Sequence, residues 1–486
     1  MTPRLHPCRT PAPRRPFVDR ENELTFIEAK LQPAMRGERM DMAVTCFWGA
    51  SGIGKSWLLG EIERLYHRHE MLGAVARPPV SARLDLDRAV GGALWQNDCL
   101  DLALIVNELW QQFAQQLGAT ALEIGESTIE DYAMRFVEQV TGWLARATPV
   151  ILLDTMDSVV QDDENAFFWL EEHLIEPLAL TDRVLFIVAG RGELRRWRRF
   201  QVRRRVDVRP LSSFDVENAG KEVSASPAVS HALYRHAFGH PLATEYLGAI
   251  LEERGVNLSE ASDEDIAAAL EPDVVRAALG AAVSRILERA PASLAQLARC
   301  AGVLRWVNVE PLRAVAQGLK LAGSDGGDAH YLDLIGQLQT QHLLYWNVDA
   351  ASYEFAPALR SLFAHSLELD DPVGFAAAHL AALNYHRKHV EAYPQYLARY
   401  VPEAAYHCAV LSRSHQLPSG TPAFAEWWEG FLARAPADAE PWEELAAAIA
   451  KDVELQKIMD SAGYELLCAG IRARSAAAQA PGEEEA

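Results

Sequence analysis

Lysine is scarce in this sequence of 486 residues, because only seven of its 46 basic residues are lysines. Acidic residues outnumber the basic ones, 67 to 46, and the formal net charge is −21. A surface with this excess of negative charge repels nucleic acids and anionic membranes. The scarcity also means that a lysine inside a motif has little chance of being there by accident.

Cysteine clusters and long apolar runs are missing as well. The six cysteines lie far apart and form no C-x-x-C pair, which excludes the common zinc and redox motifs. No apolar run reaches the ~18 residues that cross a bilayer. Residues 1–16 hold five prolines but no apolar core of a secretory signal. We therefore expect a cytoplasmic protein without membrane contact, with a flexible arm at 1–16.

Short apolar runs alternate with helical stretches from residue 17 to residue 210, a pattern typical of βαβ units. The amphipathic stretches 101–117 and 128–146 are predicted to be helices. Strands are predicted at 42–48, 79–86, 148–154, 184–190 and 204–209. We predict an α/β domain at 17–210 with a parallel five-stranded sheet.

Helical patterns replace the strands after residue 210. We predict a helical lid domain at 211–290, whose first helix starts within 212–215 and is capped by a Ser oxygen of this string. Residues 291–370 carry three helical segments and then two alternating runs around a polar turn, which predicts a winged-helix domain. The Ala-rich region 371–475 is predicted to be an all-α sensor or interaction region, for which TPR-like packing is one option. A disordered acidic tail is expected at 476–486.

One stretch indicates a ligand directly. The string GASGIGKS, residues 49–56, fits the phosphate loop G-x-x-x-x-G-K-[ST] and stands between a predicted strand and a predicted helix. In such a loop the backbone N–H groups turn toward phosphates, Lys55 reaches the β- and γ-phosphate oxygens, and Ser56 binds Mg²⁺. The predicted nucleotide-binding residues here are Gly49, Ala50, Ser51, Gly52, Ile53, Gly54, Lys55, Ser56 and Trp57.

Three further side chains follow predicted strands. Asp154 ends the run PVILLD and is predicted to be the second Mg²⁺ ligand, as in a Walker B motif. Asp157 can polarise the attacking water, or it can instead cap the following helix. Arg191 ends VLFIVAGR and can report a γ-phosphate, or it can pair with a surface carboxylate. Lys55, Asp157 and Arg191 are the predicted catalytic residues of an ASCE-type P-loop ATPase.

Two more strings narrow the class. RPFVDRENEL precedes the first strand, and GHPLA lies in the helical region. With GASGIGKS, LLDTMD and VAGR they resemble the bacterial STAND NTPases, the group that includes the NB-ARC and NACHT proteins. The resemblance covers residues 16–366 and implies ATP or ADP with Mg²⁺. It also implies that Phe17, Val18 and Arg20 lie near the adenine and that Pro241 closes over the base or ribose. From the residues alone, Pro241 is equally a favourable first helical residue.

The sequence departs from this family at three positions. Asp19 stands where the family usually has Gly, before Arg20. Asp157 stands where a Glu is common, and its side chain is one methylene shorter, which implies slow hydrolysis. In the string FAPALR, Ala356 stands where many relatives have a His that senses ADP, which implies a less firmly held resting state.

The sequence leaves the role of one group of residues open and assigns no site to another. The run 191–209 holds nine arginines, and it is interpreted as a solvated arm that faces the acidic remainder of the chain, a contact with a neighbouring subunit or a nucleic-acid contact. The expected recognition helix, 330–344, has no Lys or Arg, which argues against reading of DNA. The histidines His67, His69, His379, His386 and His389 fit no zinc spacing and are predicted to be surface residues.

Three functions are weighed on this basis. The first is an ATP-binding, slowly hydrolysing STAND-type switch that is closed with ADP and open with ATP. In the ATP state it would form a homo-oligomer or bind a protein partner through the C-terminal helical region. The second is an AAA-like ATPase that remodels protein or nucleic acid. The third is a nucleotide-gated DNA-binding regulator, with nucleic-acid contact restricted to the segment 191–209.

Overall fold

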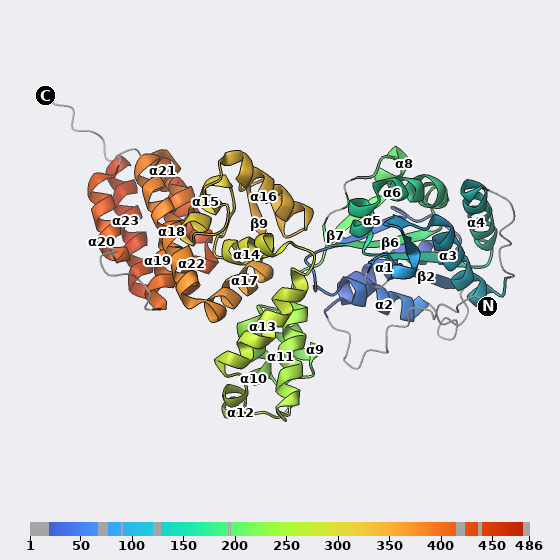
Figure 1. Ribbon diagram of the computed structural model, residues 1–486, viewed down its shortest axis with the longest axis horizontal. Coiled ribbons are helices and arrows are strands. Elements are labelled where there is room, and N and C mark those ends of the chain that lie inside the picture. The colour runs from blue at the N-terminus through green and yellow to red at the C-terminus, as the bar shows by residue number, and fades with distance from the viewer. Residues whose placement is uncertain are drawn as a thin grey trace. The chain divides into compact units, whose positions relative to one another are not determined.

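The computed structural model describes residues 19–66, 76–88, 91–119, 128–192, 194, 196–414, 423–435 and 440–479. The chain divides into two compact units, Met1–Leu270 and Glu271–Ala486 (Figure 1). The boundary between the units falls inside the range predicted for the lid, 211–290, and the predicted domain limits stay a prediction. Phe17 and Val18, two of the residues expected near a base, lie outside the described residues, as do His67 and His69.

The first unit contains a parallel five-stranded sheet, which confirms the predicted fold class of this part of the chain. Its strand order is β2-β5-β6-β1-β7. β6 therefore lies between the strand that precedes the glycine loop and the strand that ends in Asp154, as the predicted ASCE type requires. The strands are β1 (Val44–Trp48), β2 (Pro79–Asp85), β5 (Thr148–Asp154), β6 (Leu185–Gly190) and β7 (Val206–Pro210).

Both faces of this sheet are covered, which explains why its strands are continuously apolar. Alternate residues of β5 point to opposite faces: Ile151 packs in one apolar cluster and Leu152 in the other. The helices α1 (Glu21–Met35) and α2 (Lys55–Tyr66) belong to the Leu152 cluster. The opposite face carries α3 (Leu102–Leu117) and α4 (Ile129–Trp143), beginning after their caps Asp101 and Thr128.

Shorter elements complete the α/β part. A small hairpin, which the sequence pattern did not predict, precedes α3, and a run of short helices separates β5 from β6 and β6 from β7. They are η2 (Gly92–Leu94), β3 (Trp95–Gln96), β4 (Cys99–Leu100), α5 (Met156–Asp162), α6 (Glu164–Leu170), the π-helix η3 (Glu171–Ile175), α7 (Glu176–Ala179) and α8 (Phe200–Arg203).

Four helices follow the sheet within the first unit. Their first helix begins after Asp215, whose carboxylate accepts the backbone N–H of Asn218 at 2.8 Å. The helix start predicted within 212–215 is confirmed, but the predicted Ser cap is wrong, because Asp215 lies at the point where the helical backbone begins. The helices are α9 (Val216–Glu222), α10 (Pro227–Ala237), α11 (Pro241–Glu253) and α12 (Asp263–Ala269).

The second unit begins with helices and a hairpin in the order that the sequence predicted for 291–370. The hairpin is extended by a bridge between Val307 and Tyr353, so a short third segment runs beside it. The elements are α13 (Pro272–Ile286), α14 (Ala292–Ala301), α15 (Val309–Gly318), α16 (Asp328–Thr340), β8 (Leu344–Asn347) and β9 (Ser352–Phe355).

The remainder of the second unit is helical, as predicted. The helices α18 and α19 pack along one another, and Trp428 and Trp442 are completely buried where α20 and α21 join them. The elements are α17 (Pro357–Asp370), α18 (Pro372–Ala392), η4 (Pro394–Tyr396), α19 (Leu397–Arg413), α20 (Phe424–Arg434), α21 (Glu440–Lys451), α22 (Val453–Ile458) and α23 (Ser461–Gln479). None of the helices in the described ranges has the length and apolarity needed to cross a membrane.

Candidate functional site

The glycine loop lies between β1 and α2, where the sequence predicted it. Gly52 and Gly54 have φ angles of 76° and 95°, a region that side chains with a Cβ rarely adopt. A Cβ on Gly52 would lie 2.8 Å from the Cβ of Leu242, whereas one on Gly54 would meet no heavy atom within 4 Å. Gly54 therefore leaves open space at the head of α2, where helical N–H groups attract anions.

Lys55 occupies the first position of α2, and its ammonium group lies inside the loop. Its Nζ donates hydrogen bonds to the backbone oxygens of Gly49 and Ala50, both at 2.8 Å. Burial lowers the pKa of Lys55 to about 8, against the opposing charge of Asp157, and the positive charge of Arg191 lowers it further. Because its hydrogen-bond partners are neutral carbonyls, a phosphate group would stabilise this buried cation.

Asp154 lies at the carboxyl end of β5 and is 1% exposed. Its Oδ2 accepts a hydrogen bond from Nη2 of Arg83, on the neighbouring strand β2, at 2.9 Å. Arg83 also donates to the backbone oxygen of Ser56 at 3.1 Å and lies 3.6 Å from Glu63. One guanidinium thus links the predicted Mg²⁺ ligand Asp154 with the helix that follows the loop.

A second carboxylate lies beside Asp154. The sheet register pairs Asp85 with Asp154, because β2 and β5 are neighbouring parallel strands. Burial, together with the negative charge of Asp154, raises the pKa of Asp85 to about 6. Carboxylate and hydroxyl oxygens are the ligands that Mg²⁺ prefers. Asp154 and Asp85 therefore place carboxylate oxygens that suit this ion at the ends of two neighbouring strands. The hydroxyl of Ser56, on α2, stays a predicted ligand.

Asp157 and Arg191 meet at the ends of two adjacent strands. The backbone N–H of Arg191, directly after β6, donates to Oδ1 of Asp157 at 3.1 Å. Asp157 is 2% exposed and lies inside α5, because the N-cap of that helix is Thr155. The alternative interpretation of Asp157 as a helix cap is therefore wrong. Arg191 affects the pKa of Lys55, so its charge is directed toward the glycine loop.

Arg20 ties the segment before α1 to the glycine loop. Its Nη2 donates to the backbone oxygens of Ile53, at 3.0 Å, and Ser212, at 2.9 Å. Asp19 adopts a φ of 57°, a left-handed conformation that Asp tolerates better than most residues with a Cβ. This conformation explains how Asp19 can stand where the resembling family has Gly.

The start of α11 contacts the glycine loop from the other side. Nε2 of His240 donates to the backbone oxygen of Ser51 at 3.1 Å, and the N–H of Leu242 donates to Gly52 O at 3.3 Å. Burial lowers the pKa of His240 to about 4, and the positive charge of Lys55 acts in the same direction. Pro241, between them, is buried at the first turn of α11. Two hydrogen bonds to backbone oxygens of the glycine loop therefore hold the start of α11 against this loop.

Gly239 makes this approach sterically feasible. It has a φ of 73°, and a Cβ there would lie 2.0 Å from the backbone oxygen of Phe214. The N–H of Phe214 donates to Gly239 O at 2.8 Å, which holds the linker after β7 against the start of α11. Glycine is required at this position by both its conformation and its contacts.

The arginine-rich segment folds back on the helices before it. Glu171 accepts the backbone N–H groups of Arg198 and Arg199, and Trp197 is buried with its ring 5.2 Å from that of Phe167. Other ion pairs of the segment join Arg196 to Glu164, Arg199 to Glu172 and Glu176, and Arg205 to Asp182. These pairs favour the interpretation in which acidic groups of the same chain neutralise the segment.

The prediction of surface histidines is wrong for two of its members. His379 and His386 are each 1% exposed, because they lie on the face of α18 that packs against other helices. His389, one turn further along the same helix, is partly exposed. The regular spacing of polar residues on α18 gave no sign of this, since a buried polar face has the same spacing as an exposed one.

The ends of β5 and β6 and the head of α2 thus bring together Lys55, Asp154, Asp157 and Arg191, as sequence reasoning predicted. Arg20 and Pro241 lie at the same loop, whereas Trp57 is exposed on α2. Sequence reasoning missed the roles of Arg83, Asp85 and His240. Arg83 and Asp85 on β2 offered a signal. Charged side chains at the end of an otherwise apolar strand often mark a functional site.

Sheet order, glycine loop and terminal strand carboxylate together define a P-loop NTPase fold. None of the protein-family models matches the chain, and no curated protein matches it. Solved structures with a similar trace include the Walker-type ATPase PABY2304 of Pyrococcus abyssi, with 12% identity over 71% of this chain and 96% of that one, and a TM-score of 0.45. The ORC2 protein of Aeropyrum pernix, in ADPNP–ADP complexes, has 13% identity over 74% and 96%, and a TM-score of 0.43. Cdc6p of Pyrobaculum aerophilum has 13% identity over 74% and 96%, and a TM-score of 0.38.

Proposed function

We propose that this chain binds ATP with Mg²⁺ at the glycine loop and hydrolyses it slowly. The observation that carries the proposal is the buried ammonium group of Lys55, held at the head of α2 by neutral carbonyls. A positive charge at a helix N-terminus, beside backbone N–H groups, is what a polyphosphate requires. The open space at Gly54 leaves room for the phosphate.

Mg²⁺ would be held by Ser56 and Asp154, with Asp85 close enough to support it. When bound, it would neutralise negative charge on the phosphate oxygens. Lys55 would bind the phosphate oxygens through its ammonium group. Arg83 donates to Oδ2 of Asp154, so an ion that binds at this oxygen would displace part of that contact.

Asp157 would accept the proton of the attacking water. Its carboxylate is oriented by the backbone N–H of Arg191, so one oxygen is fixed while the side chain stays close to Lys55. A fixed carboxylate next to the phosphates is suitable as a general base. Its side chain is one methylene shorter than Glu, and we therefore expect slow turnover. Arg191 would stabilise the negative charge that builds up on the transferred phosphate.

The start of α11 would respond to whether ATP or ADP is bound. His240 and Leu242 donate hydrogen bonds to the backbone oxygens of Ser51 and Gly52. If the loop closes around a γ-phosphate, these two oxygens would move and the hydrogen bonds would change. Inverting a 1:99 population requires about 5.5 kcal/mol of differential binding, which charge-assisted contacts to one phosphate can supply. On this proposal the chain is a STAND-type switch that opens with ATP and closes with ADP.

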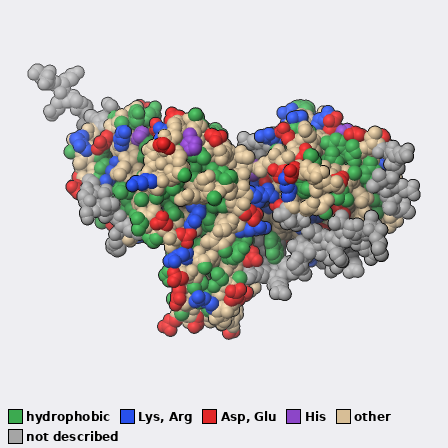
Figure 2. Space-filling view, viewed as in Figure 1, with side chains coloured by type: hydrophobic (Ala, Val, Ile, Leu, Met, Phe, Trp, Pro, Cys, Tyr) green, Lys and Arg blue, Asp and Glu red, His purple; other side chains and the backbone are tan. Residues whose placement is uncertain are grey.

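The output would be assembly of copies of this chain, or binding of a protein partner by the helices after residue 371. The elements from α14 to β9 would then be a winged helix that acts as a lever and not as a DNA reader. α16 contains no Lys or Arg. On the visible face in Figure 2, acidic side chains are interspersed with basic ones, which gives no extended positive surface for phosphates.

A second candidate is an AAA-like ATPase that remodels a partner by continuous turnover. The observation that favours it is the group of three carboxylates, Asp85, Asp154 and Asp157, at one edge of the sheet. Both functions use a base beside the Mg²⁺ ligands, but the remodelling ATPase depends on it for continuous turnover. The two functions share every binding residue and differ in turnover.

Nucleotide content and turnover distinguish them. The full chain is purified without added nucleotide, and bound nucleotide is released with acid and identified by chromatography. The switch predicts about one slowly exchanging ADP per chain and turnover far below ~1 per second, whereas the remodelling ATPase predicts faster turnover that a substrate stimulates. Failure to bind any adenine or guanine nucleotide in calorimetry with Mg²⁺ would refute both.

A further inference from the structure

Three buried side chains of the second unit converge outside the nucleotide site. His386 comes from α18, and Glu403 and His407 come from α19. One ligand atom of each lies within 4.8 Å of the others. Glu403 and His407 are four residues apart, so they lie on the same face of α19, which packs along α18. The three residues are 6% exposed or less.

Two imidazole nitrogens in this group have no hydrogen-bond partner within the described part of the chain. They are Nδ1 of His386 and Nε2 of His407, both buried. A buried polar atom without a partner costs free energy, and native proteins rarely retain one without a reason. A neutral imidazole offers a lone pair, which a metal ion requires.

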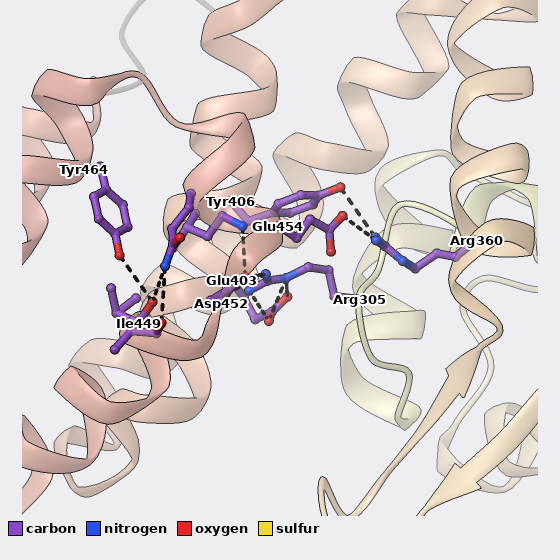
Figure 3. A network of polar contacts seen from close by, with 11 residues as sticks. Arg305, Arg360, Glu403, Tyr406, Ile449, Asp452, Glu454 and Tyr464 are labelled. Atoms are coloured by element: carbon purple, nitrogen blue, oxygen red, sulfur yellow. Dashed lines mark hydrogen bonds and ion pairs between the residues drawn. The ribbon is translucent and has the colours of Figure 1, made fainter. Parts of the chain in front are cut away.

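The groups behind these three side chains resemble the outer shell of a metal site. Nδ1 of His407 lies 2.8 Å from Nδ1 of His379, a hydrogen bond that fixes the orientation of the ring. Arg305 donates to both oxygens of Glu403, with Nη2 2.7 Å from Oε1 (Figure 3). Metal-binding histidines and carboxylates usually have such supporting partners, which fix their tautomer and direction.

The local charge also permits a cation. Arg305 and Arg360 are the guanidinium groups of the network in Figure 3, and three carboxylates face them: Glu403, Asp452 and Glu454. Two positive charges against three negative ones leave the network with a deficit of one positive charge. A divalent ion at the three ligands would change the charge of this network from −1 to +1, and a buried charge of this kind needs ligand atoms that coordinate it.

We propose that His386, Glu403 and His407 bind one Zn²⁺ ion, which joins α18 to α19. Imidazole nitrogen and carboxylate oxygen suit zinc, and two His with one Glu is a common zinc ligand set. Tetrahedral zinc with bonds of about 2.1 Å needs ligand atoms roughly 3.4 Å apart, so the side chains must draw together by about an ångström. The fourth position would be taken by water. The site does not depend on nucleotide and stands apart from the ATPase proposal.

Metal analysis of the full chain is the first test. The protein is produced with zinc in the medium, freed of any affinity tag, dialysed against metal-free buffer and analysed by plasma mass spectrometry. We expect about one zinc per chain. Less than about 0.1 zinc per chain, with no uptake after titration with Zn²⁺ in calorimetry, overturns the proposal and identifies the group as a neutral polar core.

Variants locate the ion. His407→Gln and His386→Gln should lower the zinc content at least about fivefold, whereas His365→Gln, on α17, removes a histidine of the same unit and should leave the zinc content unchanged. Circular dichroism checks that each variant folds. Equal loss of zinc in the control variant, or retention in both ligand variants, contradicts the assignment.

Cobalt gives a readout that does not depend on folding of the variants. Co²⁺ in place of zinc should produce the intense visible absorption of a four-coordinate ion in the wild-type chain. Addition of Zn²⁺ should abolish this absorption, because zinc binds nitrogen ligands more tightly than cobalt. Only the weak absorption of hydrated Co²⁺, in a chain shown to be folded, would rule out a site with this ligand set.

Discussion

Arg83 and Asp154 form a buried ion pair, with 2.9 Å between Nη2 and Oδ2, at the carboxyl ends of neighbouring strands. Burial opposes the charge on Arg83, but Asp154 and Glu63 outweigh it and raise the pKa of the guanidinium. The pair holds the predicted Mg²⁺ ligand in place before any ion binds. On the proposal above, an Mg²⁺ ion bound at Oδ2 would compete with Arg83 for this oxygen.

Replacement of this arginine tests the competition. In Arg83→Gln, Asp154 remains buried without its cation, and we expect the free energy of unfolding to fall by about 3 kcal/mol. Mg²⁺ with a non-hydrolysable ATP analogue should restore more stability to the variant than it adds to the wild type, because the ion takes the place of the lost charge. Thermal unfolding with and without Mg²⁺ measures both effects.

Arg83→Lys is the matched control, since it keeps a positive charge without the two-pronged geometry. It should lose less stability than Arg83→Gln and show a smaller additional gain from Mg²⁺. The same gain from Mg²⁺ in all three proteins would mean that Arg83 and the ion do not share Asp154.

The pKa of Lys55 predicts a pH dependence of nucleotide binding. Its pKa of about 8 in the free protein means that the ammonium is charged at pH 7 and mostly neutral at pH 9. Because the charged form binds phosphate, the affinity for ATP should fall about tenfold between about pH 7 and pH 9. Calorimetry over this range measures it, and Lys55→Ala should abolish binding at every pH. An affinity that stays constant to pH 9 would show that Lys55 remains charged.

His240 predicts a pH dependence of stability with the opposite sign. Its folded-state pKa is lowered from 6.5 to about 4, so the unfolded chain binds more protons between these values. The contribution is fully present above about pH 6.5 and is lost as the pH falls, by about 1 kcal/mol between pH 7.5 and pH 5.5. Asn at this position keeps an N–H donor but does not titrate. Urea unfolding of the wild type and His240→Asn should therefore differ in slope against pH, and parallel slopes would exclude His240 as the source.

Local signals predicted a large part of the fold and site. The strand Thr148–Asp154 was predicted with its bounds unchanged, because a continuous apolar run ending in an acidic residue has few other interpretations. The glycine loop likewise carries its own backbone requirement at Gly52 and Gly54. Both features depend on residues that are adjacent in the sequence.

The sequence did not predict contacts between residues that lie far apart along the chain. Arg83 meets Asp154 only because β2 lies beside β5, and no local pattern specifies the order of parallel strands. His240 contacts Ser51 across 189 residues of sequence. The burial of His386 likewise follows from the packing of α18 against α19, which gives a polar helix face no exposure to water.

The contact between α11 and the glycine loop should be disturbed by a side chain added at Gly239. Its φ is 73°, and an added Cβ would meet the backbone oxygen of Phe214 at 2.0 Å. Gly239→Ala should therefore cost about 3 kcal/mol of stability and weaken ATP binding. Gly255→Ala is the matched control, because Gly255 has a φ of 79° but open space around it, and only the conformational cost of about 1 kcal/mol applies. Equal losses in the two variants would argue against the predicted clash.

Replacement of Asp157 should separate ATP binding from ATP hydrolysis. In Asp157→Asn the amide oxygen can still accept the N–H of Arg191, so the contact between α5 and the segment after β6 is kept. The neutral amide cannot take a proton from water. We expect ATP to bind within a few-fold of the wild-type affinity and hydrolysis to slow at least about 100-fold.

Asp162→Asn, at the other end of α5, is the control for a lost charge on the same helix, because Asp162 pairs with Arg88 away from the loop. It should hydrolyse ATP at the wild-type rate. Asp157→Asn should also lower the pKa of Lys55, since the charge of Asp157 raises it, and should therefore move the pH dependence of binding to lower pH. Hydrolysis by Asp157→Asn at the wild-type rate, with that shift present, would leave Asp157 as a group that tunes Lys55 and remove it from the chemical step.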